Sequence, residues 1–184
     1  MTFKRLVQTI ALNMQRGAKT RGDWCRKKKI FSEFGYNVRY QIRIIPLYPE
    51  LIKIGSNINL SSGVQLITHD AIQSVYNHMP GNMRHLPEKA ECIEICDNVF
   101  IGAGCTILGN VRIGPNVIVS ANSLVNRDLE PGGIYGGTPA RRIGDFDTFW
   151  RKREKMYYPS VKHNQHITEE EIRNAWEHFE SLRS

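Results

Sequence analysis

Bulky side chains recur at every sixth position through the middle of this 184-residue chain. One series starts at Tyr36 and a second starts at Ile95. The twelve positions are Tyr36, Ile42, Tyr48, Ile54, Leu60, Leu66, Ile95, Ile101, Ile107, Ile113, Val119 and Val125. If about a third of residues are bulky and apolar, chance would give such a run on the order of once in a million. The period therefore indicates a repeated structural unit.

A period of six fits neither the 3.6-residue helix nor the two-residue alternation of a long strand. A second apolar position follows four residues after many of these anchors. Three residues after an anchor stand asparagine or glycine, which tolerate left-handed backbone angles. The residues at this third position are Asn57, Gly63, Asn98, Gly104, Asn110, Asn116 and Asn122. Each step is therefore predicted to be a short strand followed by a tight turn.

Three such steps would make one coil of a prism, so that every third anchor lies on the same face. One coil cannot bury its own anchors, so the coils must stack to form a core. Twelve anchors predict about four coils in residues 36–144, which makes the fold class mainly β. The step from Leu66 to Ile95 is several times longer than the other steps. Residues 67–94 are thus expected to leave the prism as an inserted loop.

The first 35 residues form a separate basic segment. They carry nine Lys or Arg residues and two acidic ones, whereas the rest of the chain holds 16 of each sign. Phe3, Leu6, Val7, Ile10 and Met14 have helical spacing. The simplest interpretation is a helical cap over the first coil, and the alternative is attachment to an anionic membrane surface. Nucleic acid is not an expected partner, because the folded body carries no excess charge.

Residues 145–184 are predicted to be helical again. Asp145 precedes one candidate helix, and Thr168 with Glu171 forms a capping box for another. The four cysteines, Cys25, Cys92, Cys96 and Cys105, show neither a CxxC pair nor a disulfide framework. No metal is therefore expected, and the expected location is the cytoplasm, with membrane-peripheral attachment as a further possibility.

The stretch "ICDNVFIGAGCTILGNVRIGPNVIVSANSLVNRDLEPGGIYGGTPARRIG" resembles the hexapeptide-repeat acyltransferases, in particular the O-acetyltransferases of sugars and polysaccharides. The resemblance covers roughly residues 50–144. It implies a left-handed parallel β-helix that assembles as a homotrimer, with active sites in the grooves between subunits. It also implies acetyl-CoA as the acyl donor and a sugar or polysaccharide as the acceptor.

His69 is the main catalytic candidate, because it lies where the regular coil gives way to the inserted loop. From spacing alone, a structural histidine at the edge of a coil is the simpler interpretation. The family resemblance assigns the histidine of Thr68-His69-Asp70 as the general base that removes a proton from the acceptor hydroxyl. Asp70 could orient this imidazole, cap the loop or shape the pocket.

The resemblance also implies where acetyl-CoA binds. The late coils would contribute Gly102, Ala103, Ser120, Ala121, Asn126 and Arg127. The segment "YGGTPARRIG" would add Thr138, Arg141 and Arg142 near the nucleotide phosphates, which guanidinium groups bind well.

Three alternatives remain open at this point. One is N-acetylation of an amino sugar. Another is a γ-type carbonic anhydrase, which is disfavoured because no histidine pair has the family's H-x₄-H spacing. The third is a non-catalytic β-helix. The sequence identifies neither the acceptor nor the residue that orients His69.

Overall fold

The computed structural model describes residues 2–157 and 167–183. It divides into two compact units, Met1–Thr148 and Phe149–Ser184. The first unit contains every strand of the described residues. Residues 158–166 and 184 of the predicted C-terminal segment lie outside the described residues.

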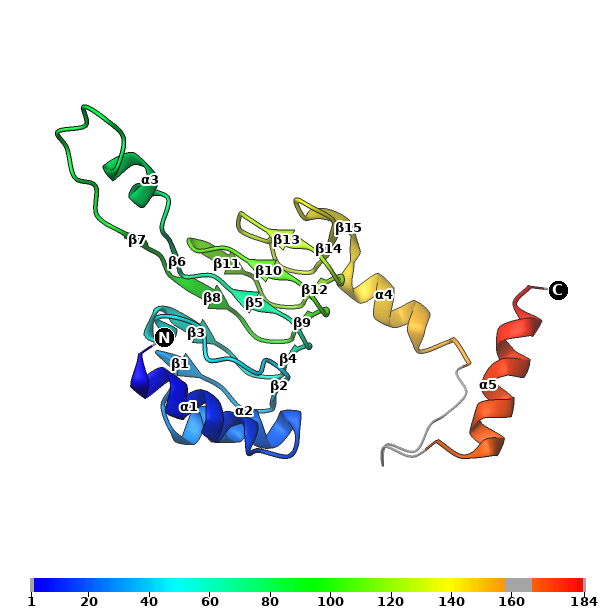
Figure 1. The fold of residues 1–184 in the computed structure, drawn as a ribbon. Helices are drawn as coiled ribbons and strands as arrows, with labels where there is room; N and C mark the ends of the chain where they lie inside the picture. The colour runs from blue at the N-terminus through cyan, green and yellow to red at the C-terminus, as the bar shows by residue number, and fades with distance from the viewer. Residues whose placement is uncertain (1, 158–166, 184) are drawn as a thin grey trace. The chain divides into compact units, whose positions relative to one another are not determined.

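The first unit is a three-sided prism built from stacked parallel strands (Figure 1). The first face contains β1 (Glu33–Phe34), β3 (Ile52–Ile54), β8 (Ile93–Ile95) and β11 (Val111–Ile113). The second face contains β2 (Val38–Tyr40), β4 (Ile58–Leu60), β9 (Val99–Ile101), β12 (Val117–Val119) and β14 (Gly133–Gly136). The third face contains β5 (Gln65–Leu66), β10 (Thr106–Ile107) and β13 (Leu124–Val125). At the end of the second face, β15 (Arg141–Asp145) pairs antiparallel with β14.

The strand register confirms the predicted coil of three six-residue steps. Ile95 pairs with Ile113 on the first face, Ile101 with Val119 on the second, and Ile107 with Val125 on the third. Every third step thus returns the chain to the same face, one coil further along.

The interior of the prism is formed by the two apolar positions of each step. All nine anchors from Ile54 onward are buried. So are the residues four positions after an anchor, which are Ile58, Val64, Val99, Cys105, Val111, Val117 and Ser123. Parallel pairing stacks these side chains in columns, so each coil buries the apolar surface of its neighbours.

The corners of the prism confirm the role predicted for asparagine and glycine. All seven residues at the third position of a step have positive φ, from 56° at Asn122 to 74° at Gly63. At the corner between the first and second faces, the asparagine side chains also bond to one another. Asn57 Nδ2 donates to Asn98 Oδ1 at 2.8 Å, and Asn98 Nδ2 donates to Asn116 Oδ1 at 2.9 Å. This ladder ties consecutive coils together.

The predicted anchors of the first coil are wrong at two positions. Tyr36 is 69% exposed and Tyr48 is 39% exposed, whereas Tyr40 is fully buried. Phe34 pairs with Ile54, so the first coil is two positions longer than the coils that follow it. The chain between β2 and β3 includes the short 3₁₀ helix η1 (Pro49–Leu51). The extra residues shift the phase of the repeat, which a search at fixed spacing cannot detect.

Two helices precede the prism, α1 (Phe3–Asn13) and α2 (Ala18–Lys27). Helix α2 lies against β2, as the cap interpretation predicts. Gly22 lies inside α2, and an added Cβ there would clash with the Val38 carbonyl oxygen. Arg21 Nε donates to the Tyr40 carbonyl oxygen at 2.9 Å. Gly22 therefore allows α2 to approach β2 closely, and the hydrogen bond from Arg21 holds the two together.

The predicted apolar stripe of α1 forms as a helical face but stays exposed. Phe3 is 81% exposed, Ile10 is 55% exposed, and the buried residue of this helix is Leu12. None of the helices in residues 2–157 and 167–183 is long and apolar enough to cross a membrane.

Two more helices follow β15, α4 (Phe146–Arg153) and α5 (Glu169–Ser181). Both predicted caps are present. Asp145 Oδ1 accepts a hydrogen bond from Thr148 N at 2.9 Å, and Thr168 forms the capping box with Glu171.

Candidate active site

The chain leaves the prism at the corner that follows the third face. Leu66 of β5 pairs with Ile107 of β10. Three residues further on, His69 therefore takes the place that Asn110 occupies one coil later. We call residues 67–92, which leave the prism at this corner, the arm. At this corner a histidine replaces the regular turn residue.

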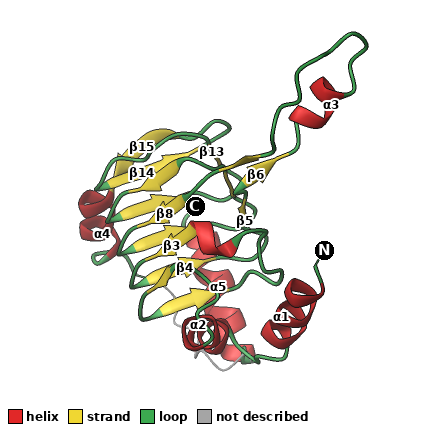
Figure 2. Ribbon diagram, turned by 90° about the vertical axis from the view of Figure 1, so that its left-hand side faces the viewer, coloured by secondary structure: helices red, strands yellow, loops and turns green. Residues whose placement is uncertain are grey.

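The base of the arm is a short antiparallel ribbon. It consists of β6 (His69–Asp70) and β7 (Lys89–Ala90), in which His69 faces Ala90 and Asp70 faces Lys89. Beyond the ribbon, the arm carries α3 (Gln73–Asn77) and extends away from the prism (Figure 2). Thr68 anchors the ribbon, because its Oγ1 donates to the Leu47 carbonyl oxygen at 2.5 Å and its carbonyl accepts from Glu91 N at 2.7 Å. These contacts hold the His69 backbone at the edge of the prism.

The His69 ring packs against the ring of Tyr48, edge to face, with 5.7 Å between the centroids. Tyr48 adopts a left-handed backbone conformation with φ of 51°, which is unusual for a bulky residue and costs free energy. Nδ1 of His69 is buried and has no hydrogen-bond partner within the described residues. A buried polar atom without a partner is unfavourable unless another molecule supplies one.

His69 and Ile67 lie between two cavities, because both residues line each of them. The first cavity, of about 520 Å³, lies toward α1 and the 42–47 segment. The second, of about 480 Å³, lies toward the later coils and is lined by Leu108, Gly109 and Asn126. An imidazole in this position can reach ligands from either side.

Asp70 makes a local contact within the arm. Its Oδ1 accepts a hydrogen bond from Ile72 N at 3.1 Å, which caps the turn before α3. Direct partnership with His69 stays a prediction. An ion pair in the second cavity joins Lys89 Nζ to Glu91 Oε1 at 2.8 Å, and this hydrogen bond raises the pKa of Lys89.

The small residues predicted to bind acetyl-CoA lie together at the corner between the second and third faces. Gly102 and Ala103 follow β9, and Ser120 and Ala121 follow β12 one coil later. An added Cβ at Gly102 would lie 2.5 Å from the backbone nitrogen of Ala121. Tight stacking of the coils is therefore sufficient to explain the glycine.

Of the nine predicted coenzyme residues, Asn126 lines the second cavity, which His69 also lines. Arg127, Thr138, Arg141 and Arg142 are exposed. Arg142 Nη2 donates to the Gly132 carbonyl oxygen at 3.2 Å and lies 3.5 Å from Asp145 Oδ2. Arg141 and Arg142 share β15, at the end of the prism reached by the last coil.

Family comparison agrees with this architecture. Residues 93–127 match the model described as bacterial transferase hexapeptide (six repeats). This part of the chain is therefore similar to hexapeptide-repeat transferases. The matched stretch covers β8 to β13, where the spacing of six is uninterrupted.

Several known proteins to which this chain is similar carry acetyltransferase names. YvoF of Bacillus subtilis, named as an acetyltransferase, is 28% identical over 123 residues, which are 66% of this chain and 64% of YvoF. The chain thus spans just under two thirds of the length of that relative. A tetrahydropyridine-dicarboxylate N-acetyltransferase of Staphylococcus aureus is 42% identical over 57 residues, which cover 31% of this chain and 24% of that protein.

Among solved structures, a maltose O-acetyltransferase from Clostridium difficile matches with a TM-score of 0.57 and 25% identity. The match covers 78% of this chain and 84% of that one.

The sequence does not predict several residues of the site. The six-residue spacing predicts Tyr48 to lie in the core, whereas its ring contacts His69. Arg5 and Glu91 line the first and second cavities, and neither belongs to a motif. These residues reach His69 only through the position of α1 and the return of the arm, for which six-residue spacing gives no signal.

Proposed function

We propose that this chain is an acetyl-CoA-dependent O-acetyltransferase in which His69 is the general base. The observation that carries the proposal is the position of His69 between two cavities, with a buried ring nitrogen that lacks a partner among the described residues. An imidazole is largely neutral near pH 7 and can accept a proton during a reaction. Two ligands that enter from opposite sides would meet at this ring.

In the proposed reaction, His69 removes the proton of the acceptor hydroxyl as the oxygen attacks the thioester carbonyl of acetyl-CoA. A carbon–oxygen bond forms, the carbon–sulfur bond breaks, and the thiolate takes the proton from the imidazolium. The acetyl ester and coenzyme A leave. No enzyme-bound acyl group is needed, so one base is sufficient.

We assign the second cavity to the acyl donor and the first to the acceptor. The second cavity lies on the side of the later coils and includes Asn126, one of the predicted coenzyme residues. The first lies between the third face and α1, away from those coils. A sugar or polysaccharide acceptor, a homotrimer and left-handed winding of the prism belong to the same proposal, and the name of the maltose O-acetyltransferase neighbour supports the first.

Thiol release from acetyl-CoA in the presence of a panel of hydroxylated sugars tests this function. We expect His69→Ala to lower kcat by about 10²–10⁴-fold, the usual contribution of a general base. His85→Ala is the matched control, because His85 is an exposed histidine of the same arm. Equal turnover of wild type and His69→Ala would refute the assignment.

N-acetylation is the second candidate, because the Staphylococcus aureus relative with 42% identity over 57 residues is named as an N-acetyltransferase. The chemistry would be the same, with an amine in place of the hydroxyl. Adding amino sugars and their hydroxyl counterparts to the panel separates the two. Turnover confined to amines would replace O-acetylation with N-acetylation and leave the role of His69 intact.

A further inference from the structure

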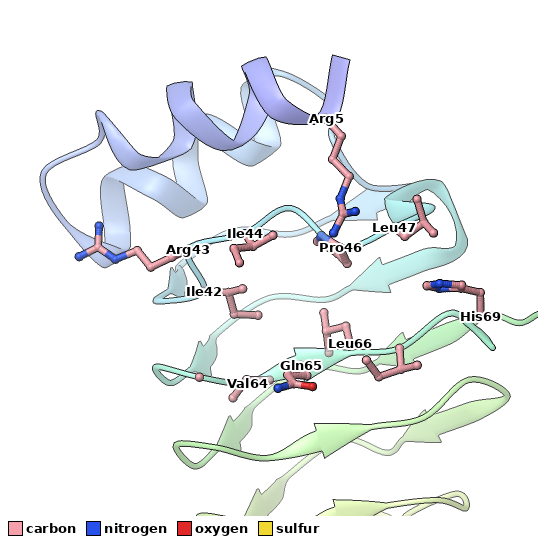
Figure 3. A pocket seen from close by; sticks show the side chains of 12 residues that line it. Arg5, Ile42, Arg43, Ile44, Pro46, Leu47, Val64, Gln65, Leu66 and His69 are labelled. Carbon is pink, nitrogen blue, oxygen red and sulfur yellow. The ribbon is translucent and has the colours of Figure 1, made fainter. Parts of the chain in front are cut away.

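The first cavity has an unusual lining for a site that binds bare sugars. Apolar side chains make up most of its wall, among them Ile44, Pro46, Leu47, Val64 and Leu66 (Figure 3). Ile44 is 58% exposed and belongs to the irregular segment between β2 and β3. An exposed isoleucine at a cavity mouth leaves apolar surface in water, which an apolar ligand would cover.

Polar groups in this cavity are few and basic. Besides His69, the polar side chains are Arg5, Arg43 and Gln65, and none of the described lining residues is acidic. Sugar hydroxyls are best held by several converging donors and acceptors. Within the described lining there is no carboxylate, and the amide is that of Gln65 alone.

Arg5 supplies positive charge to the cavity. Its side chain descends from α1 toward Pro46 (Figure 3), and its Nε donates to the Ile45 carbonyl oxygen at 2.6 Å. This bond fixes the guanidinium and uses one of its five N–H donors. The neighbouring Lys4, by contrast, lies 3.8 Å from Glu50 and does not line the cavity. Arg43 extends away from the floor of the cavity in the same view.

We propose that the acceptor is an amphiphile, in which the reacting hydroxyl is joined to an apolar group and an anionic group. The apolar group would lie against the apolar wall that includes Ile44, Leu47 and Val64. The anion, a phosphate or a carboxylate, would bind Arg5, and the hydroxyl would reach His69. This inference rests on the proposed function, because it names the substrate class of the same site.

Binding to the full-length protein tests the substrate class without any acetyl transfer. Three probes are titrated: octyl phosphate, octyl glucoside and inorganic phosphate. Octyl phosphate is expected to bind at least about tenfold more tightly than either of the others, since only it satisfies both features. Equal affinity for octyl phosphate and octyl glucoside would overturn the role of the anion, and equal affinity for octyl phosphate and inorganic phosphate would overturn the apolar part.

Matched variants locate the binding. Arg5→Gln should weaken octyl phosphate about tenfold and leave octyl glucoside unchanged, whereas Lys4→Gln should alter neither. Ile44→Ser should weaken both octyl probes, whereas Ile143→Ser, at a similarly exposed isoleucine of β15, should not. Equal losses in variant and control would overturn the assignment. A changed oligomeric mass in Ile44→Ser with unchanged probe binding would assign the cavity to subunit contact instead.

The two proposals can fail separately. Probe binding as expected together with full turnover in His69→Ala would reject the general base and keep the ligand class. Octyl phosphate binding that neither Arg5→Gln nor Ile44→Ser weakens, together with acetyl transfer that is lost in His69→Ala, would reject the amphiphilic acceptor and keep the acetyltransferase.

Discussion

The late coils (residues 93–125) and the first two coils (residues 33–66) follow the same repeat but differ in regularity. In the late coils, paired residues are separated by three full steps of six on all three faces. In the first coil, the paired residues Phe34 and Ile54 are separated by two positions more than the pairs of the late coils. The segment between β2 and β3 contains a 3₁₀ helix and a tyrosine, Tyr48, with a left-handed backbone conformation. The first cavity is lined by this irregular segment and by β5.

This difference indicates a division of roles. Regular coils bury their inward side chains in a continuous core. Departures from the repeat, at residues 42–51 and at the arm, produce the cavities beside His69. Chemistry carried by irregular segments on a stiff scaffold is a common arrangement in enzymes.

The largest expected effect on stability comes from truncating a matched residue in each region. Ile107 is fully buried in the late coils, whereas Ile44 is 58% exposed beside the first coil. Ile107→Ala should lower the free energy of unfolding by about 2–5 kcal/mol, through lost burial and a residual cavity. Ile44→Ala should change it by no more than about 0.5 kcal/mol. Urea unfolding followed by circular dichroism measures both, and similar losses would contradict the comparison.

A substitution at Gly102 tests whether this glycine is needed for the close stacking of neighbouring coils. Gly102→Ala places a Cβ 2.5 Å from the Ala121 backbone nitrogen, so one coil must shift. We expect a loss of about 1–3 kcal/mol in the free energy of unfolding. Gly144→Ala is the control, because its Cβ would meet only ordinary contacts at 3.4 Å or more. If thermal unfolding shifts equally in the two variants, stacking is not the reason for Gly102.

A smaller loss of stability is expected at the asparagine ladder, where side-chain hydrogen bonds and backbone conformation both contribute. Asn98→Ala removes the side chain bonded to Asn57 and Asn116 and places alanine at a φ of 59°. The expected loss in the free energy of unfolding is about 1–2 kcal/mol. Asn98→Gly keeps the tolerance for positive φ and loses only the ladder, so it should recover part of that loss. No difference between the two variants would show that backbone conformation contributes nothing at this corner.

The smallest expected effect concerns two buried ionisable side chains, the thiol of Cys25 and the hydroxyl of Tyr40. Burial raises the pKa of the Cys25 thiol from 9.0 to about 12 and also raises the pKa of the Tyr40 hydroxyl. Both groups stay protonated in the folded protein where the unfolded chain would ionise. Unfolding therefore releases protons at alkaline pH, and stability falls as pH rises above about 9.

Tyr40→Phe tests this pH dependence. The Tyr40 hydroxyl is buried without a partner among the described residues, so its removal should leave stability near pH 7 unchanged or raise it by up to about 1 kcal/mol. Above about pH 10, where an unfolded tyrosine ionises, the variant should lose less stability than wild type. Melting temperatures at about pH 8 and pH 11 provide the measurement. Parallel losses in the two proteins would exclude Tyr40 as a source of alkaline instability.

Much of the fold could be predicted because the repeat is a local signal. Within each six-residue step, the residue types indicate which position is buried and which forms the turn. Ile107 is an example of the buried position and Asn110 of the turn position. The prediction failed at Tyr36 and Tyr48, because two added residues change the phase without changing the composition. His69 could be singled out because it stands where the repeat stops. Its neighbours could not, because Arg5 and Tyr48 belong to other segments of the chain.

The amino-acid pattern is sufficient to predict the period, the columns of the core, the corner residues and the point at which the arm departs. Each of these depends on contacts that recur at fixed separation, so a pattern of residue types is sufficient to encode them. Only the tertiary structure decided which side chains surround His69. Helix α1, the 42–47 segment and the returning strand β7 meet there through packing between distant parts of the chain, and such packing leaves no periodic trace in the sequence.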